Sequence, residues 1–146
     1  MLGRVSAAGG GDTPEALDEA LAETVHGLAW RRDAVRLVVL VADAPPHADR
    51  TDGPRYDRDM QAALAKGIKV FPVGASGLDP SGEYVFRQLA QFTAGRFVFL
   101  TYRDAADPAS GPGSATVHDV QQYSVDTLDR LVVRLVRDEL GRLPRA

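Results

Sequence analysis

The fold is decided by one nearly uninterrupted apolar run, Val35-Arg36-Leu37-Val38-Val39-Leu40-Val41-Ala42, which ends at Asp43. All but one of its residues are apolar, and apolar side chains do not alternate with polar ones. This pattern is typical of a strand buried on both faces, as in a parallel sheet flanked by helices. Pro45 and Pro46 follow the acid and prevent an immediate helix. The sequence therefore predicts a parallel strand over 35–42 with a carboxylate at its end.

Helices and strands alternate on both sides of this run. Apolar residues at helical spacing predict helices over 14–30, 57–66, 82–93 and 124–140. Further apolar runs predict strands over 68–73 and 96–101. Pro72 should lie near the end of its strand or on an unpaired side, because proline removes a ladder donor.

This alternation predicts an α/β fold, a Rossmann-like open parallel sheet of about three strands with helices on both faces. Right-handed connections place the carboxyl ends of all strands at one edge, where ligands of such sheets bind. Residues 102–123 are rich in Gly, Pro, Ser and Asp, which predicts a long flexible loop. We expect residues 1–146 to form a single, partial domain.

Composition narrows the classes of partner. The chain has 146 residues, with 17 basic and 20 acidic side chains and a net charge of −3, which does not favour nucleic acid. It has no cysteine, so disulfides and thiolate metal sites are excluded. No apolar run is long enough for a membrane span, and the first residues do not resemble a signal peptide. The default expectation is a cytoplasmic protein, or an envelope protein if the true N-terminus lies upstream.

Two oxygen-bearing residues are the main site candidates. Thr13 follows the glycine-rich turn Gly9–Gly11 and precedes Pro14 at the start of the first expected helix. Asp43 stands where the buried strand ends, and both should emerge at the same edge of the sheet. Thr13 also has a simpler interpretation as a helix N-cap, and it can serve in both roles.

Other polar residues have weaker claims. Asp12 is a possible secondary ligand, although capping or hydrogen bonding to the glycine amides is the preferred interpretation. His47 is a second such candidate, in a loop where solvated polar residues are normal. His26 and His118 have no partner that the sequence reveals.

These residues, in this order, resemble the second half of a bacterial von Willebrand factor A domain. The resemblance rests on Gly9-Gly10-Gly11-Asp12-Thr13-Pro14-Glu15-Ala16-Leu17, on Leu40-Val41-Ala42-Asp43-Ala44-Pro45-Pro46-His47 and on the order of the elements that follow, to about residue 140. It implies a doubly wound sheet with a metal-ion-dependent adhesion site at the carboxyl ends of the strands. Thr13 and Asp43 match metal ligands of the family. The metal would be Mg²⁺, with Mn²⁺ or Ca²⁺ as alternatives, and an acidic side chain of a protein partner would complete its coordination.

The family's leading signature, Asp-x-Ser-x-Ser after its first strand, has no match here. By this resemblance three of the usual six strands are missing, and so are the ligands that the first strand supplies. Mg²⁺ prefers six oxygens, so a threonine and an aspartate would leave about four positions for water. We therefore expect weak metal binding by the chain alone.

Two other functions remain open on the sequence. One is an α/β enzyme that hydrolyses a phosphoester or a nucleotide with Asp43 as nucleophile or base, although no nucleophile elbow or Gly-x-Gly-x-x-Gly motif is present. The other is a metal-silent fragment or half-domain that associates with another chain, or with itself, through the exposed edge of strand 35–42. The favoured interpretation is a non-catalytic binding module.

Overall fold

The computed structural model describes residues 16–47, 51–74, 78–104, 107–117, 123–124 and 128–143. Its elements follow in the order α1 (Leu17–Ala22), the π-helix η2 (Glu23–Gly27), β1 (Arg36–Ala42), α2 (Tyr56–Ala65), β2 (Ile68–Gly74), α3 (Pro80–Phe92), β3 (Val98–Asp104), β4 (Asp107–Val117), β5 (Tyr123–Ser124) and α4 (Leu128–Gly141). Among the described residues, no helix is long and apolar enough to cross a membrane.

The sheet confirms the expected α/β class. Its strand order is β1-β2-β3-β4-β5. β1 pairs with β2 in parallel along its whole length, from Arg36 opposite Ile68 to Ala42 opposite Gly74, and β3 is also parallel to β2. The three parallel strands are those that the sequence predicts, and β4 and β5 extend the sheet as antiparallel neighbours.

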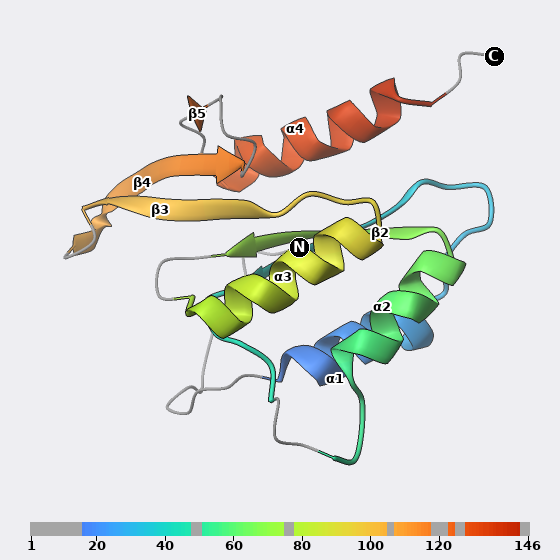
Figure 1. Ribbon diagram of the computed structural model, residues 1–146. Helices are drawn as coiled ribbons and strands as arrows, with labels where there is room; N and C mark the ends of the chain where they lie inside the picture. Colours follow the sequence, from blue (N-terminus) through green and yellow to red (C-terminus); the bar gives the residue numbers. More distant parts are fainter. Residues whose placement is uncertain are drawn as a thin grey trace.

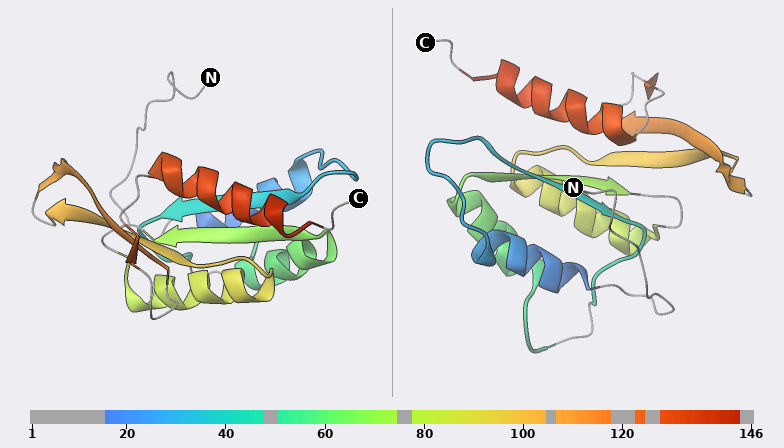
Figure 2. Two further views of the ribbon diagram at one scale, coloured as in Figure 1. Left: turned by 90° about the horizontal axis from the view of Figure 1, so that it is seen from above. Right: turned by 180° about the vertical axis from the view of Figure 1, so that it is seen from behind.

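Helices cover both faces of the sheet, as Figures 1 and 2 show. α1, η2, α2 and α3 lie on one side, which we call the three-helix face, and α4 lies on the other, the α4 face. Each face has its own apolar cluster. The larger one joins Leu21, Val70 and Phe86 on the three-helix face, and the smaller one joins Phe71, Val73, Val98, Leu131 and Leu135 on the α4 face.

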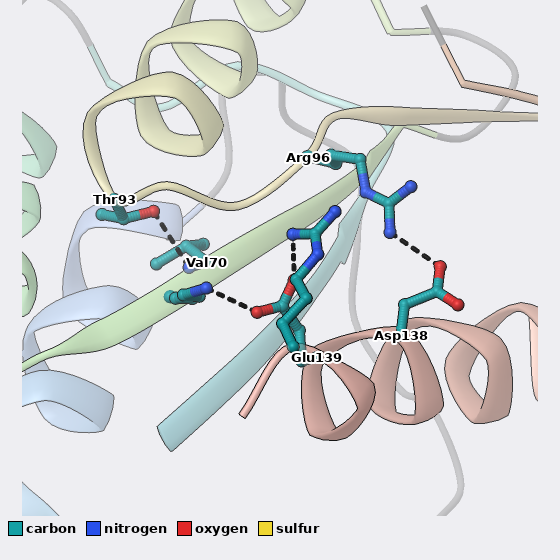
Figure 3. Close-up of polar contacts among 7 residues, drawn as sticks. Val70, Thr93, Arg96, Asp138 and Glu139 are labelled. Atoms are coloured by element: carbon teal, nitrogen blue, oxygen red, sulfur yellow. Dashed lines mark hydrogen bonds and ion pairs between the residues drawn. The ribbon is translucent and has the colours of Figure 1, made fainter. Parts of the chain in front are cut away.

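β2 and β3 diverge toward the start of β2. There, hydrogen bonds from side chains and turns take the place of backbone hydrogen bonds between the two strands. Their pairing covers only Val73 and Gly74 of β2. Further back, the buried Thr93 hydroxyl accepts a hydrogen bond from the Val70 N–H at 2.9 Å and donates one to the Leu89 carbonyl at 2.6 Å. Figure 3 shows the contact between Thr93 and Val70. Pro72 lies in the part of β2 that is paired with β1 alone, as its missing N–H requires.

A network of ion pairs fixes α4 to the sheet, at the end where β2 begins (Figure 3). The buried Glu139 carboxylate receives Lys69 Nζ from β2 at 2.5 Å and Arg142 Nη1 at 2.7 Å. Beside it, Arg96 Nη2 donates to Asp138 Oδ2 at 2.9 Å. α4 is thus bound by charge at its end and by Leu131 and Leu135 along its length.

Two expectations need correction. The helix predicted over 14–30 ends earlier, at Gly27, and Leu28 is already extended with φ −79° and ψ 142°. Glycine at the end of a helix lowers the cost of leaving it. Residues 14 and 15 lie outside the described residues, and Ala16 is the N-cap of α1.

The second correction concerns the loop predicted over 102–123, which is wrong for the described part of this segment. β3 continues to Asp104, and β4 runs over Asp107–Val117. The prolines and glycines of β4 weaken its intrinsic strand preference, but pairing with β3 overrides it. Pro112 stands opposite Tyr102, in a part of β4 that β5 does not reach, so its outer side needs no ladder donor.

Candidate functional site

Asp43 lies at the carboxyl edge of the three parallel strands. It directly follows β1, whose last residue, Ala42, stands opposite Gly74 at the end of β2. The Asp43 side chain is exposed, whereas Ala44 and Pro46 on either side of Pro45 are buried. The two buried residues anchor the turn, and the carboxylate therefore projects from a fixed backbone into solvent.

The start of α1 lies at the same edge. Asp18, in its first turn, is buried and accepts a hydrogen bond of 2.6 Å from the backbone N–H of Tyr56, the first residue of α2. α2 begins after the connection that leaves the carboxyl end of β1, and it leads back to the start of β2. The chain therefore enters α1 on the side of the sheet where Asp43 emerges.

Glycines let the backbone pack closely at this edge. A Cβ atom on Gly82, in the first turn of α3, would lie 3.3 Å from the Pro45 nitrogen and 2.4 Å from Leu78 Cδ1. A Cβ on Gly74 would lie 2.8 Å from Leu78 Cδ2. The turn that carries Asp43 thus rests against the first turn of α3, whose N-cap Asp79 accepts a 2.7 Å hydrogen bond from the Gly82 N–H.

Of the other predicted ligands, the structure describes only His47. Thr13 and Asp12 lie outside the described residues, so their predicted roles remain predictions. His47 is half-buried in the turn after β1. Among the described residues, no group of three or more His, Asp or Glu side chains lies close enough to hold a metal ion. The donors that the sequence offers, a carboxylate and a hydroxyl, are of the oxygen type that Mg²⁺ and Ca²⁺ take.

Charged and aromatic residues surround the start of α2 at this edge. Arg55 Nε donates to Asp57 Oδ1 at 3.0 Å, and this hydrogen bond lowers the pKa of the Asp57 carboxyl. Burial raises the pKa of the Tyr56 phenol, which donates to Gln88 Oε1 at 3.0 Å. Gln88 Nε2 in turn donates to the Tyr84 hydroxyl at 2.9 Å. These contacts join the first turn of α2 to the middle of α3.

The structure also gives His26 a partner that sequence reasoning missed. His26 Nε2 lies 2.8 Å from Oδ1 of Asp59, whose side chain is only 8% exposed. The two residues are 33 positions apart, on η2 and α2, and no motif joins them. Two further contacts hold η2, because Lys66 Nζ donates to the Val25 carbonyl and Trp30 Nε1 donates to the Thr24 carbonyl. The His26–Asp59 pair is therefore part of a structural attachment between two helices.

Comparison of the chain with protein-family models, with curated proteins and with solved structures gave no match.

Proposed function

We propose that this chain is a protein-interaction module of the von Willebrand factor A type. It binds an acidic side chain of a protein partner through a Mg²⁺-type cation at the carboxyl edge of the sheet. Asp43 and Thr13 would supply protein oxygens, and water and the partner carboxylate would occupy the other positions. With so few protein ligands, the affinity of the chain alone for the cation should be low.

One observation carries the proposal. The exposed Asp43 carboxylate and the entry into α1 lie at the same edge of a parallel sheet. In the sequence, Thr13 stands four residues before Leu17, the first residue of α1. The turn 43–47 adds support, because the buried Ala44 and Pro46 hold the backbone from which the exposed Asp43 carboxylate extends.

Paramagnetic Mn²⁺ tests the cation part directly. In NMR spectra, Mn²⁺ should broaden the amide signals of residues 43–47 and of the first turn of α1, because these lie nearest the proposed ion. Signals near Lys69 and Glu139, at the other end of the sheet, should stay sharp. Mg²⁺ in excess should restore the broadened signals.

Asp33 offers a matched control, because it is an exposed acid just before β1, at the opposite end of the strand. Asp43→Asn should remove the broadening, Thr13→Val should weaken it, and Asp33→Asn should leave it unchanged. Equal loss of broadening in the Asp33 and Asp43 variants would contradict a defined site.

The half-domain alternative also has a specific observation in its favour, since β1 is the last of the described strands on its side of the sheet. Association of that edge with another chain, or with a second copy, requires no cation. Sedimentation of the chain with Mg²⁺ and with EDTA separates the two, since only the adhesion function should respond to chelation.

A further inference from the structure

The connection between β1 and α2 carries the dipeptide Asp52-Gly53, the one place in the sequence where glycine follows aspartate. Residues 51–55 are all exposed and belong to no helix or strand. They lead directly into α2, which begins at the carboxyl edge of the sheet. The dipeptide therefore lies in an exposed connection on the side of the molecule from which Asp43 projects.

Gly53 leaves its own backbone nitrogen accessible. Its φ is +90°, a conformation that residues with a side chain rarely adopt. A Cβ atom built at this position would meet no atom within 4 Å other than those of its chain neighbours. The Gly53 N–H makes no hydrogen bond to the backbone of another described residue. The nitrogen is thus open to the carboxyl group of Asp52, the residue before it.

This arrangement favours an intramolecular condensation. The Gly53 nitrogen attacks Cγ of the protonated Asp52 carboxyl and loses its proton, while Cγ loses its hydroxyl group. One water leaves, and a five-membered succinimide ring closes. A second water then adds to one of the two ring carbonyl carbons. Opening at Cγ restores aspartate, whereas opening at the α-carbonyl carbon gives isoaspartate, in which the chain continues through Cβ and Cγ. No atom is oxidised or reduced, and water is the only co-reactant.

We propose that Asp52-Gly53 is a site of spontaneous isoaspartate formation in the folded chain. The product has one additional carbon atom in the backbone between β1 and α2, and it carries a free α-carboxylate. This carboxylate is the group that S-adenosylmethionine-dependent isoaspartyl methyltransferases methylate, so the aged chain becomes their substrate. The modification requires neither a cation nor a protein partner, and it is therefore independent of the proposed function.

Other aspartates in the chain are less suited to this reaction. Asp33 is exposed too, but Arg31 donates hydrogen bonds to its two carboxylate oxygens, at 3.4 and 3.1 Å. The next residue is Ala34, whose Cβ hinders attack by its nitrogen. Asp79 cannot react in this way, because Pro80 has no N–H. The sequence contains no asparagine, so deamidation adds no isoaspartate to the background.

The folded chain is incubated for several weeks at neutral pH and physiological temperature. Isoaspartate in the intact chain is counted by transfer of a labelled methyl group from S-adenosylmethionine with an isoaspartyl methyltransferase. In separate aliquots, trypsin releases the peptide Thr51–Arg55, and electron-transfer fragmentation distinguishes isoaspartate from aspartate in it. We expect at least ten-fold more isoaspartate at Asp52 than at Asp33. The rate at Asp52 should lie within ten-fold of the rate in a synthetic peptide of residues 50–56.

Three variants locate the reaction. Asp52→Glu keeps the charge but would have to close a six-membered ring, so methyl acceptance should fall at least ten-fold. Asp52→Asn loses ammonia more readily than the acid loses water, so its isoaspartate should form at least ten-fold faster. Asp33→Glu is the matched control and should age as the parent chain does. Circular dichroism before incubation checks that each variant is folded.

Equal methyl acceptance by the parent chain and Asp52→Glu would overturn the proposal. A rate in the folded chain more than ten-fold below that of the synthetic peptide would overturn it as well, because it would show that the fold keeps the Gly53 nitrogen away from the Asp52 carboxyl.

Discussion

At the scale of single residues, the Thr93 hydroxyl supplies the hydrogen-bond acceptor that a paired strand would otherwise offer to β2, at the place where β2 and β3 diverge. Thr93→Val keeps the shape of the side chain but leaves the buried Val70 N–H without its acceptor. We expect a loss of about 1–3 kcal/mol in the free energy of unfolding, measured by urea denaturation. Thr24→Val is the matched control, because the Thr24 hydroxyl also bonds to a carbonyl four residues earlier but is accessible to solvent. Equal losses in the two variants would contradict this role of Thr93.

Glycine is required at position 95 because the backbone of Val70 lies too close to leave room for a side chain, and not because of an unusual backbone conformation. A Cβ at this position would lie 1.8 Å from the Val70 carbonyl oxygen, far inside any real contact. Gly95→Ala should therefore lower the free energy of unfolding by about 3 kcal/mol through displacement of the backbone. Gly141, at the end of α4, has open space around its virtual Cβ. Gly141→Ala should be neutral or stabilise the chain by up to about 1 kcal/mol; thermal melting of both variants checks the contrast.

At the scale of elements, the attachment of α4 depends on one buried carboxylate. Glu139→Gln would leave Lys69 and Arg142 without the charge that they share, at a cost of about 3 kcal/mol in the free energy of unfolding. Asp138→Asn removes a neighbouring but more exposed pair with Arg96 and should cost less than about 1 kcal/mol. Chemical denaturation of the two variants compares the contribution of the buried Glu139 ion pairs to stability with that of the more exposed Asp138 pair. A larger loss in the Asp138 variant would be the contrary result.

Most elements could be predicted because their signals are local. The runs at 35–42 and 68–73 and the apolar spacing of α3 carry enough information in themselves to define strands and a helix. β4 could not be found in this way, since its sequence disfavours a strand and only its distant pairing partner, β3, makes it one. The same holds for the site. Asp43 is visible because it ends a strand, whereas the pairing of His26 with Asp59 depends on how two helices pack.

At the scale of the whole molecule, the sheet separates two apolar clusters of unequal size. Sheet residues contribute to both, but helices α1, η2, α2 and α3 supply the larger cluster, whereas α4 is the one described helix that supplies the smaller. If the two clusters form one cooperative unit, every probe of unfolding should report the same transition.

The chain carries a natural reporter for one side of this division. Trp30 is its only tryptophan, its indole N–H is bound to the Thr24 carbonyl, and its ring packs against the larger cluster. Intrinsic fluorescence should therefore follow the α1 side selectively, while far-ultraviolet circular dichroism averages over all helices. We expect the two denaturation curves to coincide in the parent chain and to separate in Glu139→Gln, with ellipticity lost first. If the change in emission preceded the loss of ellipticity, the larger cluster around Trp30 would be the less stable one, contrary to this expectation.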